Sequence, residues 1–327
     1  TIPSSVTSIG EDAFFEAHSL NSVTFASGAA VESIGRRAFS ETALFAITIP
    51  SSVQSIGQDA FASSPSLELL TFDGDAPTEV GTGAFLGLDD AAAAYVTNTA
   101  IGYGDEGSTW NGLVVDKVGG TYDCMTAGSQ SGTFNVSDFV VTANTDCAGE
   151  LVVPQGVKSI AASAFQNALL TSVTIPASVV TIGDNAFNSN SVITEVLFTG
   201  TSRLQSIGAS AFIYNSSLTS IAIPDSVTTI GELAFAGASV LEEVSFTTAS
   251  RLQTIGNSAF QSSGLRAFTI PRSVVTIGNY AFGQTSSLGT ITFASDALLE
   301  TIGANVFEYS GLTSVRIPSS VTSIGNF

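Results

Sequence analysis

The chain carries few residues that could perform chemistry, and His18 is its only histidine. A histidine can act as general base for a serine nucleophile when a carboxylate orients its ring. His18 lies in a Glu-Ala-His-Ser segment whose equivalents elsewhere in the chain hold serine or glycine, which favours a solvated turn residue. No catalytic constellation accompanies it, so we expect a non-enzymatic protein that needs no cofactor.

Asp73, Asp75 and Glu79 form a small acidic cluster beside a glycine. Calcium favours such oxygen-rich loops, but the cluster has neither the twelve-residue EF-hand spacing nor a nonapeptide repeat around it. Asp89 and Asp90 give a weaker signal of the same kind. A plain polar turn is the favoured interpretation, and we predict no metal site.

Cys124 and Cys147 are the only two cysteines. Their spacing does not suit a zinc knuckle. We favour a disulfide over two free thiols, and a disulfide would imply an oxidising compartment. Asn135-Val-Ser and Asn215-Ser-Ser match the glycosylation acceptor pattern, which matters only in a host that glycosylates its proteins.

The composition excludes several classes of partner. Nine Lys and Arg stand against 28 Asp and Glu, a net charge of −19. Phosphate backbones and anionic membrane surfaces both require basic patches, so we predict no nucleic-acid binding. No apolar run is long enough to insert into a bilayer. The acidic surface suits an extracellular or cell-surface protein. The chain starts and stops inside a repeat, so we expect any anchor to lie outside it.

An internal repeat dominates the sequence, and its marker is Ile-Gly-x-x-Ala-Phe. The intact copies begin at Ile9, Ile34, Ile56, Ile182, Ile207, Ile230, Ile255 and Ile277. Degenerate or truncated copies begin at Val80, Ile160, Ile302 and Ile324. From Ile160 onward the intervals are 22, 25, 23, 25, 22, 25 and 22 residues, so a short and a long repeat type alternate. Such a period is typical of a solenoid.

A second pattern, Leu-x-x-Val-x-Phe/Ile, lies between the markers, as at Leu170, Val173 and Ile175. Its alternation of apolar and polar residues predicts one short strand per coil, and stacked coils would form one parallel sheet. The marker glycine is expected to turn the backbone at positive φ. The Ala-Phe pair is expected to point inward from a short helical or 3-10 turn.

The full unit is Ile-Pro-x-Ser-Val-x-x-Ile-Gly-x-x-Ala-Phe-x-x-x-x-x-Leu-x-x-Val, carried almost complete by residues 176–196 and 271–291. It resembles the BspA-like leucine-rich-repeat proteins over residues 1–90 and 150–327. The resemblance implies a curved, β-rich leucine-rich-repeat solenoid on a microbial surface, used for adhesion to host or matrix proteins. The family offers no shared catalytic residues to transfer.

The repeat is interrupted after residue 85, where aromatic residues such as Trp110 replace the leucine ladder. We predict a first array over 1–90, a cap and connector with the Cys124–Cys147 disulfide over 91–150, and a second array over 151–327. One continuous superhelix with a bulged loop is the alternative. Caps are needed because an open coil end exposes apolar residues and unpaired strand edges.

The predicted function is a non-catalytic adhesion or protein-binding module that presents a long repeated face to an extracellular protein or cell-surface ligand. Polar residues at outward strand positions form the predicted contact face: Thr24, Thr48, Thr174, Glu195, Glu243, Thr269 and Thr292. Threonine also suits exposed strand sites for structural reasons alone. Tyr214, Tyr280 and Tyr309 are weaker contact candidates. The alternative function is a structural spacer or self-assembling component of a larger surface protein.

Overall fold

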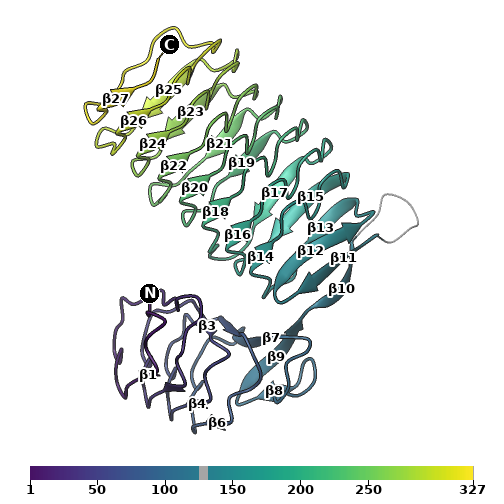
Figure 1. Cartoon of the computed structure of the whole chain (residues 1–327), viewed down its shortest axis with the longest axis vertical. Helices are drawn as coiled ribbons and strands as arrows, with labels where there is room; N and C mark the ends of the chain where they lie inside the picture. The colour runs from purple at the N-terminus through teal and green to yellow at the C-terminus, as the bar shows by residue number, and fades with distance from the viewer. Residues whose placement is uncertain (125–131, 327) are drawn as a thin grey trace. The chain divides into compact units, whose positions relative to one another are not determined.

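A computed structural model describes residues 1–124 and 132–326 of the chain. The chain divides into two compact units, Thr1–Gly119 (unit 1) and Gly120–Phe327 (unit 2). Each unit is a stack of coils built from short β-strands, and no helix occurs among the described residues (Figure 1). The predicted β-rich repeat solenoid is therefore confirmed. The division between the units lies inside the predicted connector, residues 91–150.

Unit 1 contains two sheets. The marker isoleucines form a four-stranded parallel sheet of β1 (Ser8–Ile9), β2 (Ser33–Ile34), β4 (Ser55–Ile56) and β6 (Glu79–Val80). The Leu-x-x-Val segments and the residues after them form a five-stranded sheet of β3 (Ala46–Ile49), β5 (Leu69–Phe72), β7 (Ala93–Thr97), β9 (Leu113–Val118) and β8 (Thr109–Trp110).

Unit 2 has one long marker sheet, which starts with an antiparallel hairpin layer and continues in parallel. It comprises β10 (Gly120–Cys124), β11 (Gly132–Ser137), β12 (Val140–Thr145), β14 (Ser159–Ile160), β16 (Thr181–Ile182), β18 (Ser206–Ile207), β20 (Thr229–Ile230), β22 (Thr254–Ile255), β24 (Thr276–Ile277), β26 (Thr301–Ile302) and β27 (Ser323–Ile324).

The other ladder of unit 2, called the strand face below, consists of three separate parallel sheets. They are β13 (Gly149–Val152), β15 (Leu170–Ile175) and β17 (Glu195–Phe198); β19 (Ser220–Ala222) and β21 (Glu243–Ser245); and β23 (Ala267–Ile270) and β25 (Thr290–Phe293). The coils of unit 2 thus pair throughout the marker sheet and, within each of these three sheets, a second time along the strand face, where the sequence analysis expected one sheet. The Val-x-x-Ile segment before each marker glycine also pairs, because its β-branched residues suit a strand.

The prediction of a helical or 3-10 turn for the Ala-Phe pair of the marker is wrong in the described coils. Asp12 and Glu16, and their equivalents in the next coils, adopt positive φ. The N–H groups of Asp12, Phe14 and Glu16 donate to the Arg36, Ala38 and Ser40 carbonyls of the next coil. A helix would direct these donors within the segment. Here every second N–H leaves the coil, so the turns stack as a hydrogen-bonded row.

The marker glycine was expected to adopt positive φ, but it is needed for a different reason, the close approach of neighbouring coils. None of the marker glycines from Gly10 to Gly325 is among the residues with positive φ. A Cβ built on Gly57 would lie 2.5 Å from the Arg36 nitrogen and 2.6 Å from the Gly35 carbonyl carbon. The coil backbones therefore approach too closely there for any side chain.

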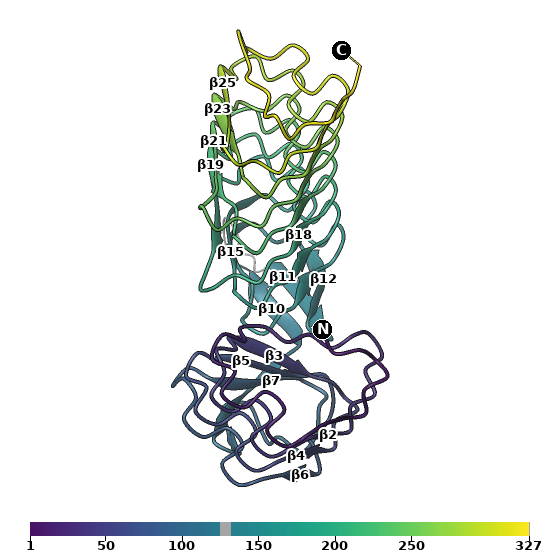
Figure 2. The same ribbon diagram turned by 90° about the vertical axis from the view of Figure 1, so that its left-hand side faces the viewer.

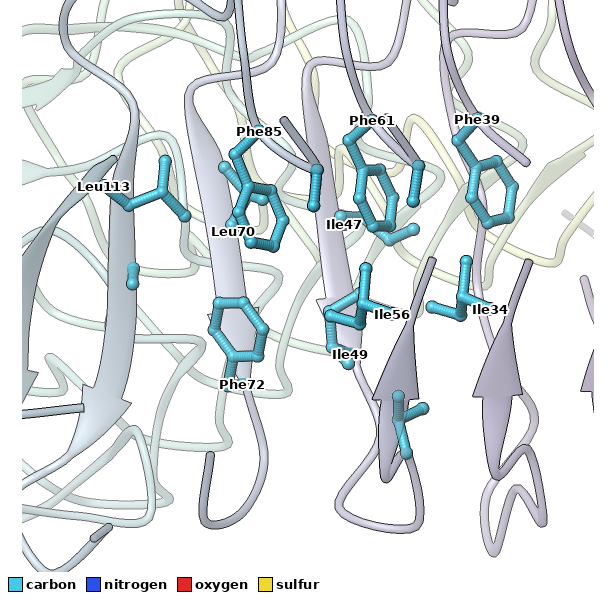
Figure 3. Close-up of a cluster of buried hydrophobic side chains, with 14 of the residues drawn as sticks. Ile34, Phe39, Ile47, Ile49, Ile56, Phe61, Leu70, Phe72, Phe85 and Leu113 are labelled. Atoms are coloured by element: carbon cyan, nitrogen blue, oxygen red, sulfur yellow. The ribbon is translucent and has the colours of Figure 1, made fainter. Parts of the chain in front are cut away.

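The core of each unit is a stack of marker phenylalanines, one from each coil. In unit 1, rings of Phe14, Phe39, Phe61 and Phe85 follow one another with centroids 5.1, 5.4 and 5.7 Å apart. Figure 3 shows Phe39, Phe61 and Phe85 in this row, with Ile34 and Ile56 in a second row below. Their burial removes large apolar areas from water and stabilises every coil through its neighbours.

Different residues cover the two stacks where the repeat is interrupted. In unit 1, Trp110 lies 5.2 Å from Phe72 and 5.8 Å from Phe85, and Tyr103 lies 4.8 Å from Trp110, measured between ring centroids. In unit 2, Phe134 on β11 lies 5.7 Å from Phe165 of the first marker turn. Both sets keep an end phenylalanine away from water.

Cys124 at the end of β10 and Cys147 after β12 form a disulfide, with Cα atoms 5.5 Å apart. The bridge closes the hairpin layer that covers Phe165. It supports the predicted pairing of the two thiols.

Replacing both cysteines with serine is expected to lower the free energy of unfolding of unit 2 by about 2 kcal/mol, because a 23-residue loop becomes unconstrained in the unfolded chain. Urea unfolding followed by circular dichroism would measure this. Wild type in reducing agent should reproduce the effect, and a double variant as stable as oxidised wild type would contradict it.

Candidate functional site

The strand face of unit 2 alternates buried and outward residues. Val173, Val196, Ile221, Val244 and Phe268 point inward and are buried. The residues between them point outward and are mostly exposed and polar. Figure 2 shows β19, β21, β23 and β25 following one another along one side of the unit. This face therefore presents polar side chains that the core does not use.

The predicted contact residues lie in both units. Thr24 and Thr48 belong to unit 1, where Thr24 lies outside any strand and its hydroxyl contacts that of Thr1 at 2.8 Å. The other five lie on the strand face of unit 2, and all are exposed except the half-buried Thr174. Thr269 and Thr292 are direct partners on β23 and β25. These five residues of unit 2 are Thr174, Glu195, Glu243, Thr269 and Thr292.

The residues considered above for catalysis or calcium binding have structural roles in the fold. His18 Nδ1 lies 3.0 Å from the Glu41 carbonyl oxygen of the next coil, and the Asp75 carboxylate accepts the Ile101 N–H at 2.9 Å. Glu79 lies in β6. Within 1–124 and 132–326, no group of three or more His, Cys, Asp or Glu side chains has an arrangement that could hold a metal ion. The same residues include no helix of the length and apolarity that would cross a membrane.

The strand face is broken between β17 and β19 and again between β21 and β23. The ladder leucine or isoleucine recurs after 25 residues at the first break (Ile193 to Leu218) and after 24 at the second (Leu241 to Leu265). The paired strands of the strand face have intervals of 22 or 23 residues, as between Leu151 and Val173 and between Leu218 and Leu241. Both breaks of the strand face thus coincide with its longer intervals.

A groove of about 740 Å³ lies at the second break, between β21 and β23. Residues 247–250 of one long repeat and 294–296 of the next form its two ridges, and the short repeat between them supplies Pro271 and Arg272 as the floor. A smaller groove of about 310 Å³ occupies the equivalent place at Pro224 and Asp225. The alternation of long and short repeats thus produces a groove at each of these two short repeats.

Hydrogen bonds hold the ridges of the larger groove in place. The Ser273 hydroxyl donates to the Ser250 and Leu252 carbonyls at 2.9 and 2.8 Å. The Leu298 N–H donates to the Arg272 carbonyl at 3.0 Å. Since these bonds attach both ridges to the short repeat, the groove is formed before any ligand arrives.

Two exposed ion pairs border the groove. Arg266 lies 2.7 Å from Glu242, and Arg272 lies 2.5 Å from Asp296. The hydrogen bond to Glu242 raises the pKa of the Arg266 guanidinium above its ordinary value, so this side chain stays charged. Exposed pairs contribute little to stability. Their arrangement instead gives the groove a defined pattern of charge.

The remaining surface candidates differ in exposure. Tyr214 and Tyr309 are 60% and 75% exposed, and Tyr280 is 37% exposed. All three adopt positive φ in the turn row. Asn135 is exposed on β11, whereas Asn215 is completely buried, so the folded chain offers only Asn135 as a glycosylation acceptor of the two.

Replacing Tyr280 with asparagine is expected to stabilise unit 2 by about 0.5 kcal/mol, because asparagine tolerates positive φ better than a bulky residue does. Asn185 and Asn305 already occupy this turn position in other coils. Thermal unfolding would measure the change, with Tyr280→Phe as a neutral control. A lower midpoint for the asparagine variant would show that the ring contributes more than the strain removes.

The family can be assigned from the repeat. A family model described as a BspA type leucine rich repeat region, with six copies, matches residues 1–100, 143–216 and 205–327. The chain belongs to the BspA-type leucine-rich-repeat family. The resemblance drawn from the Ile-Gly-x-x-Ala-Phe marker is confirmed. Comparison with curated proteins found no match.

Several solved structures are similar to this BspA-type chain. A leucine-rich-repeat protein of Treponema pallidum shares 25% identity over 51% of this chain and 79% of its own, with a TM-score of 0.45. A leucine rich cell surface protein of Faecalibacterium prausnitzii shares 24% over 90% and 78%, with a TM-score of 0.36. The pneumococcal vaccine antigen PcpA shares 18% over 99% and 73%, with a TM-score of 0.32.

Proposed function

We propose that the chain is a non-catalytic protein-binding module that acts outside the cell or on its surface, and that the strand face of unit 2 is its contact surface. The observation that carries the proposal is the mostly polar and mostly exposed outward row of β17 to β25, whose side chains the core does not need. Repeated weak contacts along such a face add up through avidity.

Two further features support the location and the mode of action. The Cys124–Cys147 disulfide suits an oxidising compartment. Glu195 and Glu243 are exposed and form no ion pair with any described residue, so a partner can use both carboxylates. The expected partner is an extracellular or cell-surface protein.

Light scattering after size-exclusion chromatography comes first, because a self-assembling spacer would grow with concentration whereas a binding module would remain monomeric. Extracellular-matrix and cell-surface proteins are then screened with the monomer. For a partner so found, Glu195→Lys with Glu243→Lys should weaken binding at least tenfold. Glu232→Lys with Glu300→Lys, an equal charge change at two exposed residues outside the strand face, should not. Equal affinities for all three proteins would reject the strand face as the contact surface.

A further inference from the structure

Three tyrosines of unit 2 occupy backbone positions that do not suit a bulky residue. Tyr214, Tyr280 and Tyr309 adopt φ values of 59°, 55° and 53° in the turn row. Positive φ is an outlier for a bulky residue, and backbone strain of this kind is concentrated at functional sites. Asn167 occupies the position of Tyr214 in the first marker turn of unit 2, so a smaller residue fits there. The rings therefore serve something other than the stability of the backbone.

Glycine residues leave two of these rings accessible. A Cβ built on Gly237, which holds the position of Tyr214 in the next coil, would lie 2.5 Å from Cδ1 and 2.9 Å from Cε1 of the Tyr214 ring. The ring thus lies along the row over Gly237, and Tyr214 is 60% exposed. Gly283 lies beside Tyr280, with its Cβ position 3.6 Å from Cδ1 of that ring. The backbone supports both rings, and no side chain of these glycines covers them.

The turn row of unit 2 is polar but uncharged. In unit 1 the positive-φ positions of the marker turns include Asp12, Glu16, Arg37, Glu41 and Asp59. In the described marker turns of unit 2 every such position is uncharged. Hydroxyl and amide groups are supplied there by Asn185, Ser189, Ser258, Ser262, Gln284 and Asn305. On a chain with a net charge of −19, such a surface suits an uncharged ligand better than a basic one.

Main-chain hydrogen bonds place two of the tyrosines on one line. The residues of this line follow one another, coil by coil, in the order Tyr214, Gly237, Ser262, Gln284 and Tyr309, and the first four each donate an N–H to a carbonyl of the next coil. Since hydrogen-bonded coils repeat at about 4.8 Å, Tyr214 and Tyr309 lie about 20 Å apart. Between them the Ser262 hydroxyl donates to Gln284 Oε1 at 2.9 Å, which leaves the amide N–H groups of the exposed Gln284 for a ligand.

We propose that the turn row of unit 2 binds a neutral, linear polysaccharide whose sugar rings stack on Tyr214 and Tyr309. Its hydroxyl groups bond to Ser262 and Gln284 between the two rings, and Tyr280 adds a third ring one coil before Tyr309. The C–H groups on the face of a sugar are attracted to the negative face of an aromatic ring, and sugar hydroxyls match hydroxyl and amide side chains. A folded protein would need a continuous apolar centre, which rings separated by polar residues do not offer. This site is independent of the strand face.

Affinity electrophoresis tests the site, with native gels that contain hydroxyethyl cellulose, laminarin or galactomannan. We expect at least one of these neutral polysaccharides to retard the wild-type chain, and the anionic heparin to have no effect. Tyr214→Asn combined with Tyr309→Asn should lower the affinity at least tenfold. The same pair should not lower the thermal unfolding midpoint, because asparagine tolerates positive φ. Tyr214→Phe combined with Tyr309→Phe keeps both rings and should bind within threefold of wild type.

Leu169→Asn is the matched control. Leu169 also adopts positive φ and is 58% exposed, but it has no aromatic ring, so this change should leave the retardation as it is. Absence of retardation by all three neutral polysaccharides, or equal retardation of wild type and the asparagine pair, would overturn the proposal. A protein partner that the asparagine pair no longer binds, with no polysaccharide bound by wild type, would overturn it too, because the rings would then serve a protein contact.

Discussion

Replacing Phe235 with alanine is expected to lower the free energy of unfolding of unit 2 by about 4 kcal/mol. The ring is completely buried and lies between Phe212 and Phe260, with centroids 5.4 Å away on both sides and ring planes within 2°. Alanine removes both stacking contacts and leaves a cavity that the neighbouring coils cannot fill, because hydrogen bonds on two ladders fix their spacing.

Phe307→Ala is the matched control. Its ring occupies the same marker position but has one stacked neighbour, Phe282 at 5.9 Å, and is only half-buried. We expect a loss of about 1–2 kcal/mol. Urea unfolding followed by circular dichroism measures both variants. Equal losses would mean that the phenylalanine stack does not carry the coupling between coils.

Gly57→Ala is expected to destabilise unit 1 by about 3 kcal/mol, since the new methyl group would overlap backbone atoms of the preceding coil. The nearest of them are the Arg36 nitrogen at 2.5 Å and the Gly35 carbonyl carbon at 2.6 Å. Backbone atoms cannot rotate away as a flexible side chain would. The coils would have to separate, which would stretch the β2–β4 hydrogen bonds.

Gly10→Ala separates this explanation from one based on φ. Gly10 occupies the same marker position, but a Cβ there would meet no atom within 4 Å. If close approach is the reason for the glycine, Gly10→Ala should leave the stability of unit 1 unchanged or raise it slightly. If an unusual backbone conformation were the reason, both alanine variants would be destabilised alike, and chemical denaturation of the two would show it.

The solenoid was predictable because the fold depends on a periodic property. Each coil must present Ile, Ala-Phe and Leu-x-x-Val to the same neighbours, so a fixed spacing in sequence becomes a fixed place in space. The stack from Phe165 to Phe307 follows directly. Six of the seven predicted contact residues lie in strands and outside the core, because the period of a strand determines which side chains point outward.

The conformation of the marker turn and the reason for the marker glycine were not predictable from the sequence of one coil alone. A 3-10 helix and the observed turn both bond residues three apart, as Ala13 does with Gly10, and they differ in whether alternate N–H groups find acceptors in another coil. A glycine required by positive φ and one required by a close neighbour look the same in a sequence. The larger groove coincides with an interval of 24 between ladder residues, but β5 and β7 pair across the same interval, so the sequence alone does not place the break.

The boundary of unit 1 had no periodic signal either. The marker pattern stops at Phe85, yet β7, β8 and β9 still belong to the first unit, which extends to Gly119. Tyr103 and Trp110 explain this extension, since they pack on Phe72 and Phe85 without repeating any earlier spacing. Which aromatic residues cover a coil end is a matter of shape, which the sequence pattern does not encode.

The stacked marker turns give each array an electrical direction. In every described coil the turn N–H groups donate toward the next coil, as from Phe165 to Ala186 and from Phe187 to Ala211, so the peptide dipoles of the row add instead of cancelling. The first turn of an array therefore presents bare carbonyl oxygens, and the last presents bare N–H groups. A cap for the first turn must supply donors, and in unit 2 the Asn144 side-chain amide donates to the Ala164 carbonyl. Caps for the two ends of such a row are not interchangeable, and two arrays could join head to tail but not head to head.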